Sequence, residues 1–178
     1  NWLGDTIMCL PAIREFKKRN TACRITVLAK PKLCGLWKLF PEVSRILELQ
    51  SGIRGTSSAA RAIREEKFSR AFIFPNSFRA ALIPFLGRVP LRIGPRGHQR
   101  AWLLTRIAGS RQNAATAHQA LEYYDILGLD TGKAEPPEPE LSIPAELRRE
   151  MLAFLPPVPA GSMFIGLIPG AARGPSKR

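Results

Sequence analysis

The feature that most constrains the fold is a regular alternation of short apolar runs with longer stretches of helical periodicity. We expect strands at 24–29, 45–49, 71–74, 91–94 and 163–168. We expect helices at 6–19, 32–40, 57–67 (capped by Ser57 or Ser58), 78–86, 99–108, 115–127 and 145–155. Short apolar strands separated by helices of roughly ten to fifteen residues predict a parallel sheet with helices on both faces. The fold class is therefore α/β, with a Rossmann-like sheet.

Two proline-rich stretches interrupt this pattern, at 135–140 and 156–159, and such composition is typical of linkers. We expect a first domain at 1–131, a linker with a short helix at 132–162, and the first strand of a second domain at 163–178. The chain opens with Asn1 directly on a loop-to-helix motif and stops just after a strand-like run. We therefore expect it to be a piece of a longer protein.

The charge balance favours acidic partners. The chain has 27 Lys and Arg against 14 Asp and Glu, a formal charge of +13. Such a charge favours nucleic acid, an anionic membrane surface, or a phosphorylated or carboxylated substrate. The basic run 92–100 lacks the interleaved aromatic residues of a nucleic-acid surface, so we do not expect nucleic acid as a partner.

The cysteines and histidines predict neither a metal site nor a disulfide framework. The three cysteines have no CxxC spacing, and neither histidine lies near them. We expect a reducing, cytoplasmic environment. Apolar stretches of membrane-spanning length and a secretory signal pattern are both missing from the sequence, so any membrane contact is expected to be peripheral.

Several polar residues stand where they either cap a helix or serve a site. Asp5 follows Gly4 at the start of the first predicted helix, where a carboxylate is favoured as a cap. Asn76 and Ser77 precede the helix predicted from residue 78 and have the same two interpretations. His118, in the first half of its predicted helix, is expected to be structural.

Ligands of doubly wound sheets bind outside the carboxyl ends of the strands. The segments 1–5, 75–79, 94–98 and 169–177 are all expected there, and they would combine a carboxylate, an Asn-Ser pair, a glycine-bearing turn with Lys177, and arginines. The arginines are Arg79, Arg92, Arg96 and Arg100. Such a set suits an anionic, hydroxyl-rich ligand. The run from Arg92 to Arg100 could equally be a solvated surface.

Three enzyme classes have no support. The sequence contains neither GxGxxG nor GxxxxGK[ST], so a dinucleotide oxidoreductase and a P-loop NTPase are not indicated, and no cofactor is expected. A lone carboxylate without a paired acid also argues against a glycoside hydrolase.

Four blocks resemble the lipopolysaccharide heptosyltransferases of glycosyltransferase family 9, and within that family the heptosyltransferase II branch. They are Trp2-Leu3-Gly4-Asp5, the block from Phe74 to Phe85, the stretch from Arg92 to Gly97, and Pro169-Gly170-Ala171 with the ending from Gly174 to Arg178. The resemblance runs in order across the whole chain. Heptosyltransferase I shares the same plan.

The resemblance implies a GT-B glycosyltransferase, whose N-terminal domain holds the acceptor and whose C-terminal domain holds the nucleotide sugar. The donor would be ADP-L-glycero-D-manno-heptose, and the acceptor Kdo-lipid A or heptosyl-Kdo-lipid A, at the inner face of the cytoplasmic membrane. A non-catalytic module that binds anionic glycans or lipid head groups is the alternative. Without a second domain, the chain alone is expected to be inactive.

The resemblance also implies roles for individual residues. Asp5 would be the general base of an inverting transfer, and Lys177 would neutralise the departing diphosphate in place of a metal. Gly170, Ala171 and Ser176 would join Lys177 on the donor side. By position and charge we assign the remaining candidates to the acceptor side: Gly4, Asn76, Ser77, Arg79, Arg92, Arg96 and Arg100.

Overall fold

The alternation of helices and strands expected from the sequence is present in the computed structural model. The structure describes residues 3–97, 99–109, 120–130, 141–155 and 161. The elements are α1 (Leu3–Arg19), β1 (Thr26–Ala29), α2 (Pro31–Lys38), β2 (Arg45–Glu48), α3 (Gly52–Glu66), β3 (Arg70–Phe72), α4 (Phe78–Leu86), β4 (Leu91–Gly94), the 3-10 helix η1 (Ala101–Leu103), β5 (Arg106–Ile107), α5 (Ala120–Leu127) and α6 (Ala145–Ala153). The mixed α/β class is confirmed.

All the strand pairs are parallel, as predicted. Strands β1 and β2 form one ladder, in which Val27 is opposite Ile46. Strands β3, β4 and β5 form a second ladder, in which Phe72 is opposite Ile93. Parallel strands need crossover connections. The helices α2, α3 and α4 supply three of them.

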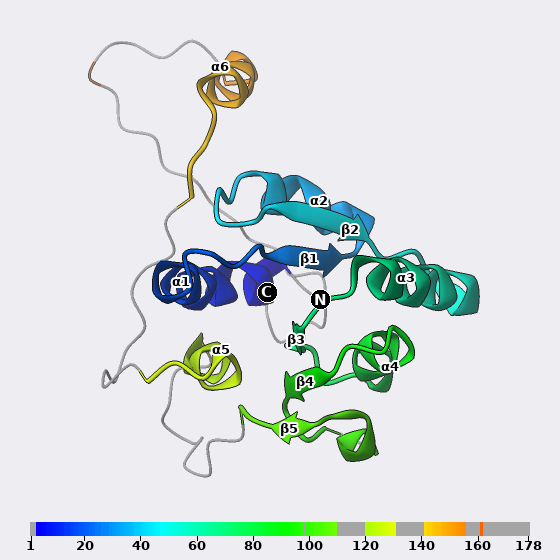
Figure 1. Ribbon diagram of the computed structural model, residues 1–178. Helices are drawn as coiled ribbons and strands as arrows, with labels where there is room; N and C mark the ends of the chain where they lie inside the picture. Colours follow the sequence, from blue (N-terminus) through cyan, green and yellow to red (C-terminus); the bar gives the residue numbers. More distant parts are fainter. Residues whose placement is uncertain (1–2, 98, 110–119, 131–140, 156–160, 162–178) are drawn as a thin grey trace, which may run out of the picture. The chain divides into compact units, whose positions relative to one another are not determined.

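Helices cover both faces of the strands: α1 and α5 lie on one side, and α3 and α4 on the other (Figure 1). Successive strand residues point to opposite faces. Accordingly Val27 and Phe72 pack in the core with α1 and α5, whereas their neighbours Leu28 and Ala71 pack in the core with α3 and α4. Burial on both faces explains why these strands read as continuous apolar runs.

The core beneath α1 and α5 positions the first turn of α1. Its buried residues come mainly from α1, α2 and α5, and include Leu10, Trp37 and Tyr124. Phe16 of α1 contacts Phe72 of β3 edge to face, with ring centroids 5.2 Å apart. Helix α1 is therefore held against both α5 and the sheet.

Helix α3 begins earlier than expected. We predicted a start at Ser57 or Ser58, but the helix begins at Gly52 with Ser51 in the N-cap position. Glycine and threonine are poor helix formers, so the helix propensities of Gly52, Gly55 and Thr56 do not predict a helix at its first turn. Packing explains Gly55, because a Cβ there would lie 2.1 Å from the carbonyl oxygen of Gln50.

The prediction of a helix at 99–108 is wrong. The segment forms η1 and then β5, which pairs with β4. Thr105 shows the reason: its backbone N–H donates to the Arg92 carbonyl at 2.9 Å, and its hydroxyl accepts from the Arg92 N–H at 2.7 Å. Pairing with a neighbouring strand overrides local helical preference here.

The chain divides into two compact units, 1–142 and 143–178. Within the second, α6 confirms the helix expected near 145–155, and none of its residues is buried. The strand expected at 163–168 and residues 115–119 of another predicted helix lie outside the described residues. The domain bounds 1–131, 132–162 and 163–178 stay predictions. In the described part of the chain, no helix has the length and apolar character needed to cross a bilayer.

Two isoleucines on neighbouring helices test the core. Ile83 of α4 is 0% exposed, whereas Ile53 of α3 is 88% exposed. We expect Ile83→Ala to lower the free energy of unfolding by about 2–5 kcal/mol, because it leaves a cavity in the core. The matched control Ile53→Ala should change it by no more than about 0.5 kcal/mol. Urea titration followed by circular dichroism measures both, and equal losses would contradict this packing.

Candidate active site at the carboxyl ends of the strands

The loop after β3 carries two of the predicted site residues, Asn76 and Ser77, and both are exposed. Ser77 is the N-cap of α4, since its hydroxyl accepts a hydrogen bond from the backbone N–H of Ala80 at 3.3 Å. The side-chain oxygen of Asn76 accepts from the guanidinium of Arg100 at 3.5 Å. The capping interpretation therefore holds for Ser77.

Arg100, which we expected to face a ligand, instead points inward and is 0% exposed. Its guanidinium donates to the carbonyl oxygens of Pro75, Ser77 and Pro95 at distances of 2.5–3.1 Å. These bonds join the loop after β3 to the loop after β4. Burial lowers the pKa of Arg100, while the nearby charge of Glu122 raises it. An arginine remains charged under either influence. Arg100 thus shapes the loops and has no surface for a ligand in this structure.

Gly97 allows the loop after β4 to approach Arg100. Its φ is +52°, in the left-handed region that favours glycine. A Cβ at Gly97 would lie 2.5 Å from Nε of Arg100 and 3.1 Å from the carbonyl oxygen of Asn76. A larger residue would therefore push the two loops apart.

Arg79 and Arg96, also expected on the acceptor side, differ in their surroundings. Arg79 is half-buried and donates to Thr56 Oγ1 at 2.8 Å and to the Gly52 carbonyl at 3.2 Å, so it ties α4 to the start of α3. Arg96 is exposed and makes no hydrogen bond or ion pair within the described residues. Among the four predicted arginines, Arg96 has its guanidinium available.

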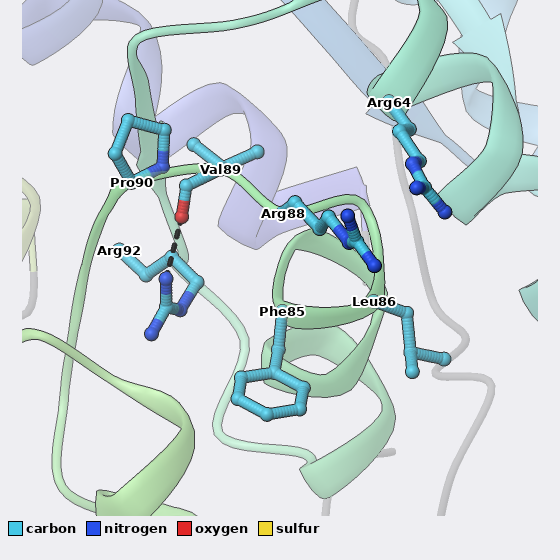
Figure 2. Close-up of a pocket in the computed structure, with 7 residues that line it drawn as sticks. All are labelled: Arg64, Phe85, Leu86, Arg88, Val89, Pro90 and Arg92. Atoms are coloured by element: carbon cyan, nitrogen blue, oxygen red, sulfur yellow. Dashed lines mark hydrogen bonds between the residues drawn. The ribbon is translucent and has the colours of Figure 1, made fainter.

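Arg92 lies away from this loop cluster, near the amino end of β4. It donates to the carbonyl oxygens of Leu103 at 2.6 Å and Val89 at 2.5 Å. It also lines an open pocket of about 580 Å³ (Figure 2). The other lining residues are Arg64, Phe85, Leu86, Arg88, Val89 and Pro90. The structure therefore separates Arg92 from Asn76 and Arg100, with which we had grouped it.

Asp5 lies in the first turn of α1 and is half-buried, while Gly4 is exposed. Burial and then the charge of Asp5 raise the pKa of Tyr123 on α5, so this phenol stays protonated at neutral pH. The Tyr123 ring contacts Phe74 edge to face, with centroids 5.0 Å apart. Phe74 directly precedes the loop that carries Asn76. Two rings thus connect the surroundings of Asp5 with that loop.

Helix α5 contributes two further candidates, Glu122 and Tyr123. Burial and the charge of Asp125 raise the pKa of Glu122, and the positive charge of Arg100 partly offsets this rise. No motif marks either residue. They become candidates only because α5 packs against α1.

The candidate site offers a half-buried carboxylate, Asp5, whose charge influences the phenol of Tyr123, and the exposed side chains of Asn76 and Arg96. A carboxylate can accept a proton from a hydroxyl, and a guanidinium can bind a phosphate or carboxylate. Among the described residues, no group of three or more His, Cys, Asp or Glu is placed to hold a metal. Gly170, Ala171, Ser176 and Lys177 lie outside the described residues.

Arg100 and Arg96, from one loop, give a matched test of this site. Arg100→Met should lower the free energy of unfolding by about 3 kcal/mol, because three carbonyl groups lose a charged donor. Arg96→Met should change it by no more than about 0.5 kcal/mol, because the side chain is exposed. Thermal and urea unfolding measure both. An equally stable Arg100→Met variant would show that Arg100 does not hold the loops.

The comparison with protein families gives a direct match. The family model of glycosyltransferase family 9 (heptosyltransferase) matches residues 56–178. The chain is 29% identical to lipopolysaccharide heptosyltransferase 2 of Salmonella typhimurium, with all of the chain and 54% of that protein covered. It is 26% identical to lipooligosaccharide heptosyltransferase 2 of Haemophilus ducreyi, again with all of the chain and 54% of the relative covered. The chain thus spans about half the length of the curated relatives it matches.

Two solved structures share the fold. The ADP-heptose lipopolysaccharide heptosyltransferase II of E. coli superposes with a TM-score of 0.73 at 24% identity, over 86% of this chain and 47% of that one. The family 9 glycosyltransferase of Veillonella parvula gives a TM-score of 0.74 at 19% identity, over 86% and 46% of the two chains. Together with the family match, the sequence and the fold show that this chain belongs to glycosyltransferase family 9, the heptosyltransferases.

Proposed function

We propose that this chain is the acceptor-binding part of an inverting heptosyltransferase. The enzyme would transfer L-glycero-D-manno-heptose from ADP-heptose to Kdo-lipid A or heptosyl-Kdo-lipid A of the lipopolysaccharide inner core. Family membership supports this reaction class. The observation that carries the proposal is the position of Asp5, half-buried at the first turn of α1, the helix that packs against α5.

Asp5 is proposed as the general base. The acceptor hydroxyl oxygen attacks the anomeric carbon of heptose, the bond from that carbon to ADP breaks, and Asp5 takes the hydroxyl proton. Asp5 lies in the first turn of α1, and its carboxylate can take the proton once the hydroxyl is within hydrogen-bond reach. Lys177, with Gly170, Ala171 and Ser176, is proposed to neutralise the diphosphate that leaves.

The acceptor side is proposed to use Arg96 and Asn76 directly. An exposed guanidinium suits the phosphates and Kdo carboxylates of the acceptor, and an amide suits a sugar hydroxyl. Ser77, Arg79 and Arg100 would fix the loops, given the hydrogen bonds they already make. Arg92 lies away from the loop cluster and is not included in this contact.

The substrates also set the proposed location. The lipid-linked acceptor lies in the cytoplasmic membrane, so the protein would work in the cytoplasm in peripheral contact with its inner face. The alternative, a non-catalytic module for anionic glycans or lipid head groups, uses the same basic loops but needs no base. The two proposals differ in what they require of Asp5.

A chimera tests the role of Asp5. In it, this chain replaces the matching half of the Salmonella heptosyltransferase 2, and turnover is followed with ADP-heptose and heptosyl-Kdo-lipid A. We expect Asp5→Ala to lower kcat by about a hundredfold or more, because general-base catalysis contributes on that scale. Acceptor binding should be retained, since Arg96 and Asn76 are unchanged.

The control for Asp5 is Asp130→Ala, which removes an exposed carboxylate outside the proposed site. It should leave kcat within about twofold. Near-normal turnover of the Asp5→Ala chimera would reduce Asp5 to a helix cap. A chimera that binds acceptor but never transfers heptose, with the parent enzyme active in parallel, would favour the binding module.

The chain by itself is expected not to transfer heptose. A GT-B enzyme closes its cleft with two domains, and this chain matches about half the length of its relatives. A sensitive assay of ADP release with the 178-residue chain and both substrates measures this. Product formation above the rate without protein would refute the prediction.

A further inference from the structure

An exposed cluster of large apolar side chains lies along α4 and η1. We call it the aromatic patch; its members are Phe78, Phe85 and Leu86 of α4 and Trp102 of η1, which are 43%, 37%, 46% and 64% exposed. The Trp102 ring lies 6.2 Å from that of Phe78 and 5.6 Å from that of Phe85. Its indole N–H donates to the Gln99 carbonyl at 3.1 Å. The three aromatic members therefore form a contiguous surface.

Helix α4 is apolar on both sides. Its inner side contributes Ala81, Ile83 and Pro84 to the buried core, and its outer side carries most of the aromatic patch. Its one charged residue is Arg79. A helix that is hydrophobic all round is normally covered on all sides, and large exposed apolar patches mark interaction sites. The outer side of α4 thus has the character of a docking surface.

Arginines border the aromatic patch. The guanidinium of Arg92 lies over the ring of Phe85 at 5.4 Å, and Arg64 and Arg88 line the same pocket as Phe85 and Leu86 (Figure 2). We call Arg64, Arg88 and Arg92 the arginine rim. The whole segment 67–121 contains no Asp or Glu, and its charged residues are Lys67, Arg70, Arg79, Arg88, Arg92, Arg96, Arg100, Arg106 and Arg111. The aromatic patch and the arginine rim therefore suit a partner that is anionic next to an apolar surface.

We propose that the aromatic patch and the arginine rim dock this protein on an anionic phospholipid bilayer. Phenylalanine and tryptophan rings lie at the boundary between head groups and acyl chains, while arginines reach the lipid phosphates. The apolar centre matches the boundary of the acyl chains in such a membrane, and the arginine rim matches the lipid phosphates.

Two other partners fit less well. Nucleic-acid bases stack on open aromatic faces, but Phe85 has Arg92 over its ring and meets Trp102 edge to face at 77°. A second copy of this chain would, in a two-fold interface, bring the same arginine rim against itself, and the pocket that the rim lines has no acidic residue. The charge pattern therefore favours lipid.

The inference deepens the proposed function and rests on it only for the membrane-bound nature of the acceptor. Phe78 directly follows Asn76 and Ser77, so a bilayer that contacts the aromatic patch would lie beside the proposed acceptor loop. Membrane docking can be measured without donor or acceptor. Its failure is therefore distinguishable from failure of heptose transfer.

The experiment is vesicle flotation of the full chain. Vesicles of phosphatidylcholine with roughly one third phosphatidylglycerol should bind it more strongly than vesicles of phosphatidylcholine alone. Arg64→Gln and Arg88→Gln should each lower the partition coefficient about fivefold. The double variant Phe85→Ser/Trp102→Ser should lower it about tenfold or more, because two rings no longer enter the interface.

Controls come from α3, where Ile53 is 88% exposed and Arg54 is exposed. Ile53→Ser and Arg54→Gln should leave partitioning within about twofold. Equal binding to neutral and anionic vesicles, or unchanged binding by the Phe85→Ser/Trp102→Ser variant with a native circular dichroism spectrum, would overturn the proposal. The proposal would also be overturned if the chain formed a dimer without vesicles and this variant abolished that dimer. Binding to double-stranded DNA that the variant weakens, together with no binding to vesicles, would overturn it as well.

Discussion

The loops that follow parallel strands carry backbone carbonyl groups that the sheet does not pair, and these groups need hydrogen-bond donors. In this protein a buried guanidinium supplies such donors. Arg100 donates to carbonyls in the loops after β3 and β4, and a planar group with several donors can reach them together. The loop geometry of the candidate site thus depends on a side chain with no exposed surface of its own.

The two parts of the candidate site are held by different forces. Apolar packing of α1 against α5 and the strands positions Asp5, through contacts such as Phe16 with Phe72. Charged hydrogen bonds position Asn76 and the loop of Arg96. The contact between Tyr123 and Phe74 joins the two parts. Under the proposed mechanism, the distance from base to acceptor therefore depends on both kinds of interaction.

Helix α4 unites three functions of the proposed enzyme in one rigid element. Its N-terminus, capped by Ser77, follows the candidate acceptor loop, and its inner side fills the core. Its outer side carries most of the aromatic patch. A lipid-linked acceptor would need a fixed distance between its head group and the membrane surface. A single short helix would keep that distance fixed, because it has no flexible joint.

Local pattern by itself determined the alternation of elements in this protein. It predicted α4 at 78–86 and β4 at 91–94 with the bounds that the structure shows, because periodicity and flanking turn residues are properties of neighbouring positions. The tertiary structure decided that residues 99–108 pair with β4 and do not form a helix. It also decided which arginine is buried, which holds a loop and which is exposed. Arg79, Arg92, Arg96 and Arg100 look alike in sequence, and only the carbonyl groups that the fold brings to each one distinguish them.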